Sequence, residues 1–211
     1  MDGERPPQRR RGRPGHDQDA VLNAAVRLFN ARGYDATSMF DVAETLGITK
    51  STLYHHVSGK EQLLAMAVDR ALDGLFEAAA QVSGEKRAID RLERLISSSV
   101  LVLAERLELV TLLLRVRGNT EVEQHALARR REFDGIVTDL VKQAQAEGSI
   151  RSDVDAATAA RLIFGMVNSL VEWYRPERGH PETLARTVVE LAFRGLRTEA
   201  TNTTQDDQRR Q

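Results

Sequence analysis

The sequence predicts an all-α protein in which a small N-terminal helical domain precedes a larger helical one. Alanine, leucine, glutamate and arginine, which all favour helices, are abundant. Only five of the 211 residues are proline, and three of these stand in the first fourteen positions. From residue 17 onward apolar residues recur at helical spacing, and no segment shows the alternation of a strand. With no cysteine in the chain, disulfides, thiolate zinc sites and cysteine nucleophiles are excluded.

Apolar periodicity and capping residues together predict about nine helices. The first covers about residues 17–31 and stops at Gly33. The second is short, begins with a capping box between Ser38 and Asp41, and closes at Gly47. A third short helix covers 49–56, and a capping box at Ser58 and Glu61 starts a long fourth one. The remaining helices are expected at about 86–103, 105–117, 121–147, 155–174 and 182–197.

The charge is balanced overall but concentrated at the N-terminus. The formal net charge is −1, yet residues 1–14 hold five arginines against Asp2 and Glu4, a local charge of +3. A solubility tail, a targeting signal and a nucleic-acid-binding arm all fit such a segment. Arg11 and Arg13 belong to an R-G-R-P sequence like that of an AT-hook, whose arginines enter a narrow A·T-rich minor groove. We expect residues 1–16 to form a disordered basic arm.

Two short helices joined at Gly47, after one amphipathic helix, predict a helix-turn-helix at residues 38–56. The second short helix carries donors that suit base edges and phosphates in a major groove. No acidic residue lies between Glu44 and Glu61, and Lys60 adds a cation at the start of the next helix. A solvated connector is the alternative reading. The donors are Thr49, Lys50, Ser51, Thr52, Tyr54 and His55.

Catalytic, metal and membrane functions have no support in the pattern. The five histidines never pair at the i, i+3 or i, i+4 spacing of two ligands on one helix face, so we expect no metal and no cofactor. His55 and His56 point about 100° apart on a helix and have no carboxylate near them in sequence, so we expect no enzyme. No stretch approaches the ~18 consecutive apolar residues of a spanning helix.

The run from Val21 to Leu63 resembles the DNA-binding domain of TetR-family transcriptional regulators. The motifs that carry the resemblance are F-x-x-x-G-Y-x-x-T-S, D-V-A-x-x-x-G-I and T-L-Y-H-H-V-x-x-K-E-x-L. Thr52 and Val57 depart from it, because many members have Gly and Phe there. The resemblance implies that the following residues face DNA: Thr37 or Ser38, Thr49, Lys50, Ser51, Tyr54, His55 and Lys60.

The resemblance also implies a cytoplasmic, nucleoid-associated homodimer on a palindromic operator, with a small-molecule effector. We expect residues 17–62 to bind DNA, residues 63–199 to bind the effector and dimerise, and residues 200–211 to be disordered. Apolar stripes on the last two helices are the expected dimer seam: Ile163, Val167, Leu170 and Val171 with Gly165 and Ser169, then Leu184, Val188, Leu191 and Phe193. Each stripe also suits an internal core.

The effector pocket is expected among the central helices. Residues 153–176, ending W-Y-R-P, are similar to members that respond to acyl-CoA thioesters, which makes an acyl-CoA the leading effector. A drug or aromatic metabolite that controls an efflux pump is the alternative, and an architectural DNA-binding protein without effector is a further one. The expected lining residues are Leu107, Val110, Leu114, Arg117, Phe133, Met166, Asn168 and Trp173.

Overall fold

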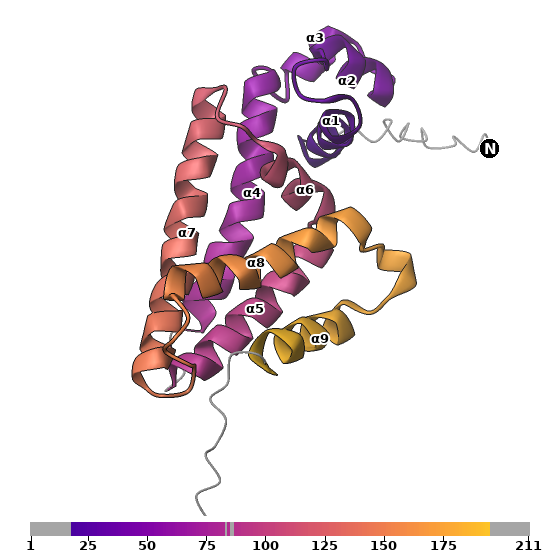
Figure 1. The fold of residues 1–211 in the computed structure, drawn as a ribbon. Helices are drawn as coiled ribbons and strands as arrows, with labels where there is room; N and C mark the ends of the chain where they lie inside the picture. Colours follow the sequence, from indigo (N-terminus) through magenta and orange to yellow (C-terminus); the bar gives the residue numbers. More distant parts are fainter. Residues whose placement is uncertain (1–17, 83, 85–86, 195–211) are drawn as a thin grey trace, which may run out of the picture. The chain divides into compact units, whose positions relative to one another are not determined.

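A computed structural model describes residues 18–82, 84 and 87–194 of the chain. This part contains nine α-helices, one short 3-10 helix and no strand, which confirms the all-α prediction (Figure 1). Arg11, Arg13 and the predicted tail at 200–211 lie outside the described residues. The helices are α1 (Gln18–Arg32), α2 (Met39–Leu46), α3 (Lys50–Tyr54), α4 (Lys60–Gln81), α5 (Ala88–Glu105), α6 (Leu107–Arg115), α7 (Glu121–Ala146), α8 (Ala156–Trp173), η1 (Pro176–Arg178) and α9 (Pro181–Arg194).

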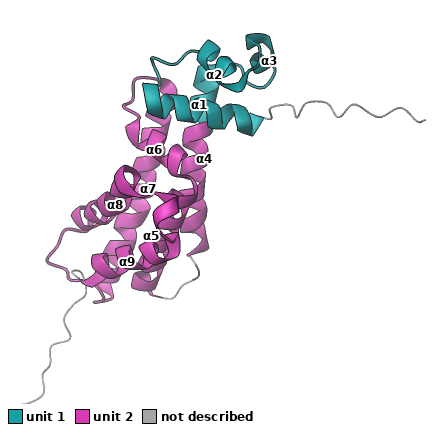
Figure 2. Cartoon of the chain, turned by 90° about the vertical axis from the view of Figure 1, so that its right-hand side faces the viewer, with its two compact units in different colours: residues 1–66 teal, residues 67–211 magenta. Residues whose placement is uncertain are grey.

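The chain divides into two compact units, residues 1–66 and residues 67–211 (Figure 2). The division falls inside α4, a few residues beyond the 62/63 boundary that the sequence predicts. Ser58 bonds to the side chain of Gln62 and not to Glu61. Because α4 begins at Lys60, Ser58 lies one residue before the N-cap position, and Gln62, the third helical residue, reaches back to it; the predicted Ser58–Glu61 capping box is therefore wrong.

Unit 1 is built on α1, α2 and α3, with α2 packed against both neighbours (Figure 1). Apolar residues at helical spacing bury one side of α1, and Phe29 meets Tyr34 edge-on with 5.1 Å between ring centroids. Gly47 ends α2 in the left-handed conformation, at φ 64°, which a residue without a side chain adopts at little cost. This turn lets α3 start three residues later and closes the helix-turn-helix.

Unit 2 is organised around α5, which packs against α6, α7, α8 and α9. Its Leu92, Ile96, Val100 and Leu103 recur at helical spacing and are all buried. Three rings bind α4, α7 and α8 together, because Phe133 lies edge-on to both Phe76 and Phe164, at 5.8 and 5.2 Å.

Most large apolar residues of the predicted dimer stripes are buried in the core of unit 2. The side chains of Ile163, Val167, Leu170, Val188 and Phe193 are buried in the chain's own core. Val171 and Leu184 are half-buried, and Leu191 is exposed. Besides Leu191, which belongs to the predicted stripe, the large apolar side chains that α8 and α9 expose are Leu162, Met166 and Trp173.

Two arginines attach α4 to the rest of unit 2. Arg129 of α7 pairs with Asp69 at 2.8 Å and with Asp73 at 2.7 Å, and its guanidinium lies over the Phe76 ring. Arg106, at the break between α5 and α6, donates from Nη1 to the carbonyl oxygen of Arg70 at 2.7 Å. A Cβ at Gly74 would come within 2.6 Å of that guanidinium and 2.9 Å of Cγ1 of Val102, so a larger residue there would require these side chains to shift.

A buried carboxylate organises the loop between α6 and α7. Glu123 is only 6% exposed and accepts backbone N–H bonds from Arg117 at 2.7 Å, Gly118 at 2.8 Å and Asn119 at 3.2 Å. Burial alone would raise the pKa of Glu123, but the three backbone donors outweigh it and hold the pKa below its ordinary value of 4.5. Glu123 is therefore the anchor of the α7 start, next to the N-cap Thr120.

Candidate DNA-binding surface and effector pocket

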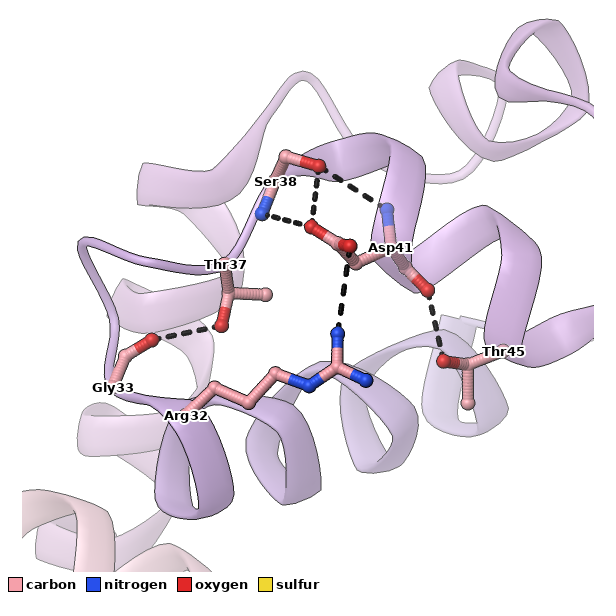
Figure 3. Close-up of polar contacts among 6 residues, drawn as sticks. All are labelled: Arg32, Gly33, Thr37, Ser38, Asp41 and Thr45. Carbon is pink, nitrogen blue, oxygen red and sulfur yellow. Dashed lines mark hydrogen bonds and ion pairs between the residues drawn. The ribbon is translucent and has the colours of Figure 1, made fainter.

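The start of α2 is fixed by a reciprocal capping box (Figure 3). The Ser38 backbone N–H donates to Oδ2 of Asp41 at 2.7 Å, and the Asp41 N–H donates back to Oγ of Ser38 at 3.2 Å. The Ser38 hydroxyl also donates to Oδ2 of Asp41, and this bond, the bond from the Ser38 N–H and the nearby positive charge of Arg32 lower the pKa of Asp41. Arg32 also pairs with Asp41 at 3.5 Å, which ties α1 to α2. The first turn of α2 is thus tied both to its own cap and to α1.

Thr37 and Ser38 were alternative candidates for contact with DNA, and the structure places their side chains differently. Thr37 is 2% exposed, and its hydroxyl donates to the carbonyl oxygen of Gly33 at 2.8 Å. It holds the loop between α1 and α2, so its side chain does not face the surface. Ser38 is exposed, although its hydroxyl also serves the capping box.

The predicted recognition helix α3 presents its donors to the outside. Leu53 is its buried anchor, while the side chains of all six predicted donors are exposed. Thr49 caps the helix, since its Oγ1 accepts from the Thr52 N–H at 3.1 Å and lies 2.9 Å from the Thr52 hydroxyl. The Lys50 ammonium lies 5.8 Å from the centre of the Tyr54 ring. Burial of one residue and exposure of the donors is the arrangement that a groove-reading helix needs.

Lys60 is placed differently from the donors of α3. Its Nζ donates to the carbonyl oxygen of Tyr34 at 2.9 Å and lies 4.3 Å from the centre of the Tyr34 ring. An ammonium group has three donors. Lys60 therefore braces the α1–α2 loop and keeps donor capacity for a phosphate.

An open pocket of about 350 Å³ lies in unit 2, where α8 ends and α9 begins. Arg175, Arg178 and His180 give it basic groups, Trp173 gives it an aromatic face, and no residue of its described lining is acidic. Arg175 folds back on the end of α8, where it donates to the carbonyl oxygen of Tyr174 at 2.7 Å. Tyr174, Gly179, Thr183, Leu184 and Thr187 complete the lining.

Of the predicted effector-binding residues, the structure brings only Trp173 to this pocket. Val110 and Phe133 are buried core residues, while Leu107, Leu114 and Asn168 are half-buried. Met166 is exposed on α8, and the side chain of Arg117 is exposed on the loop that Glu123 organises. The sequence-based lining includes none of Arg178, His180, Thr183 and Thr187, although Arg178 belongs to a polar cluster that the sequence offers as a pointer to the pocket. The signal was the cluster E-W-Y-R-P-E-R-G at residues 172–179.

Within the described residues, no helix is long and apolar enough to cross a membrane. The same part of the chain holds no group of three His, Cys, Asp or Glu side chains that could bind a metal ion.

A three-helix unit with a donor-rich recognition helix, joined to a larger helical unit, defines a helix-turn-helix transcriptional regulator. Residues 21–67 match the family model "Bacterial regulatory proteins, tetR family", and residues 85–196 match "Tetracyclin repressor-like, C-terminal domain". The chain belongs to the TetR family of transcriptional regulators, which are DNA-binding proteins and not enzymes.

Relatives agree with this assignment. The HTH-type transcriptional repressor KstR2 of Rhodococcus jostii is 29% identical over 189 residues, covering 83% of this chain and 89% of the relative. The crystal structure of SCO3833, a TetR-family member from Streptomyces coelicolor A3, is 50% identical with a TM-score of 0.77 and covers 84% of this chain and 91% of that one. AibR in complex with isovaleryl coenzyme A and operator DNA is 29% identical with a TM-score of 0.72, covering 83% and 97%.

Proposed function

We propose that the protein is a homodimeric repressor that leaves a palindromic operator when an acyl-CoA thioester binds. The observation that carries the effector class is the pocket beside Trp173, where Arg175, Arg178 and His180 meet without an acidic residue. Guanidinium groups pair with phosphate oxygens through two parallel hydrogen bonds, and an aromatic ring offers a stacking face to adenine. Coenzyme A supplies both phosphates and an adenine.

Two relatives support the proposal. AibR was solved with isovaleryl coenzyme A and operator DNA, and KstR2 is a transcriptional repressor. The alternative effector is a drug or aromatic metabolite, and a cationic drug fits the pocket poorly, because two arginines repel a cation that approaches them.

We assign dimerisation to the exposed apolar side chains of α8 and α9. Leu162 and Met166 lie four residues apart on one face of α8, and Leu191 is exposed on α9, while Trp173 lines the proposed effector pocket. Exposed apolar side chains on two helices of one unit are the basis for this assignment, because large apolar surface left to water is typical of an interaction site. A dimer reads a palindrome when its recognition helices are about 34–36 Å apart, and an effector that prefers another spacing weakens DNA binding by linkage.

Thermal melting against a panel of acyl-CoA thioesters, their free acids and cationic drugs tests the effector. A ligand at ~100 times its Kd stabilises by about 2.7 kcal/mol, which raises the melting midpoint by several degrees. We expect a thioester to shift the melt and its free acid to leave it unchanged. A shift by drugs alone would refute the thioester assignment.

A matched pair of variants tests the pocket. Arg178→Gln removes a lining guanidinium, whereas Arg186→Gln makes the same change at an exposed α9 position outside the lining. A lost hydrogen bond to a charged group corresponds to about ten- to hundredfold in affinity. We expect that loss for the active thioester in the first variant only. Equal affinities in the two variants would place the phosphates elsewhere.

A further inference from the structure

Unit 1 exposes two large apolar side chains among its described residues, and both lie on the helix-turn-helix. Tyr54 of α3 is 46% exposed and was expected from its place on the recognition helix. Phe40 is 62% exposed in the first turn of α2, where the neighbouring Met39 and Val42 are buried. Phe40 therefore contributes little to the core of unit 1, and its ring remains available to a partner.

The backbone that carries Phe40 is held in place from both sides. The capping box joins Ser38 to Asp41 across it, and Arg32 anchors Asp41 to α1 (Figure 3). The helix also packs against α3, whose Thr49 and Lys50 are exposed. Because the backbone is already ordered, only the two side-chain torsions of the ring lose freedom when it makes a contact.

The chemistry of a major groove gives this ring one apolar target. Base edges there present donors, acceptors and the 5-methyl group of thymine, and Phe is among the side chains that contact this methyl. The exposed donors of α3 suit the polar groups or the phosphates. An apolar ring on the neighbouring helix can contact the thymine methyl group, which hydroxyl and ammonium groups recognise poorly.

We propose that Phe40 is a specificity-determining residue that contacts the methyl group of one thymine in each operator half-site. The proposal rests on operator binding by the helix-turn-helix. A contact between Phe40 and a second dimer bound to the same DNA is the competing use of the ring. It differs in that it would depend on protein concentration and not on one methyl group.

The experiment starts from a palindrome that the wild-type protein selects from a randomised duplex pool. Each thymine is then replaced by deoxyuridine, which lacks only the methyl group, in symmetric pairs across the two half-sites. Affinities of the full chain are measured by fluorescence anisotropy at one fixed salt concentration. Selection of a discrete palindrome tests the proposed function itself, and the uridine scan tests Phe40 alone.

We expect one thymine position at which uridine weakens wild-type binding by about fourfold per half-site, the worth of one buried methyl group. Phe40→Ala should bind the thymine operator more weakly and be insensitive to uridine at that position. Glu44→Gln alters another exposed residue one turn further along α2 and should keep the full methyl sensitivity. Both variants should melt like the wild type, because neither side chain is buried.

Two results would overturn the proposal. One is a uridine scan of Phe40→Ala that matches the wild-type scan at every position. The other is a loss of affinity in Phe40→Ala that appears only at protein concentrations where a second dimer joins the DNA.

Discussion

Replacing Glu123 with alanine is expected to destabilise unit 2 more than an ordinary surface substitution. The carboxylate gathers the backbone N–H groups of Arg117, Gly118 and Asn119 at the start of α7. Alanine leaves those donors without their acceptor and removes a negative charge from the positive end of a 26-residue helix. Glu123→Gln keeps an acceptor oxygen but loses the charge.

The structure sets the size of the effect. Hydrogen bonds to a charged group each contribute about 1.5–3 kcal/mol, but Arg117 and Asn119 are exposed enough for water to replace their bonds once the loop opens. We therefore expect Glu123→Ala to cost about 2–3 kcal/mol and Glu123→Gln about 1 kcal/mol. For a chain of this length the alanine variant should melt about 4–12 °C below the wild type.

The pH dependence gives the charge its own test. Burial alone would raise the pKa of Glu123, but the three backbone donors hold it below 4.5, so the group binds its proton more weakly in the folded chain. Its stabilisation is present above pH 4.5 and is lost as the pH falls through the folded pKa. The gap between wild type and Glu123→Gln should therefore be constant from about pH 6 to 8 and close in acid.

Glu121→Gln is the matched control, because it makes the same change in the same first turn of α7 at an exposed side chain. Denaturant or thermal unfolding across pH measures both variants. Equal stability of Glu121→Gln and Glu123→Gln at neutral pH would refute the anchoring role of the Glu123 carboxylate.

Three further outcomes are expected. Lys60→Met keeps the alkyl stem but removes the ammonium, and it should flatten the slope of log affinity against log salt by about one unit per site, as a lost phosphate contact does; an unchanged slope would contradict that contact. Arg129→Ala should cost about 1 kcal/mol by thermal unfolding, because Asp69 and Asp73 are substantially exposed and such pairs are weak; a much larger loss would show a stronger coupling. Deleting residues 1–14 should weaken binding most on operators with A·T-rich flanks, and equal losses on G·C-rich flanks would leave only general electrostatics.

Helix positions were predictable because their signals are local. Gly33 and Gly47 end α1 and α2, Ser38 caps α2, and apolar spacing gives one buried side to each helix. The C-terminal end of α6 was harder to predict. The sequence predicts a helix to residue 117, whereas α6 ends at Arg115. The stop depends on Glu123 drawing in the N–H groups of residues 117–119, a contact that helical periodicity does not contain.

The direction in which an apolar stripe faces was not predictable. Ile163 and Leu162 are adjacent, and both are aliphatic, yet one is buried and the other exposed. A sequence that offers apolar residues on two sides of α8 fits an internal core and an intermolecular surface equally well. The packing of α5 and α7 against α8 decides which side is covered.

The predicted effector-binding residues raise the same difficulty, because an apolar residue fits an internal core and a pocket lining equally well. Val110 and Phe133 are apolar residues of the kind that line a pocket. Both are buried, and Phe133 lies edge-on to two other rings. Burial alone does not distinguish a core side chain from a pocket lining, so their contact with an effector stays a prediction. The pocket beside Trp173 is instead marked by basic and hydroxyl side chains on a turn, which no apolar periodicity brings out. The proposed effector site therefore rests on polar residues that a turn gathers at the end of a helix, and Arg178→Gln tests that proposal directly.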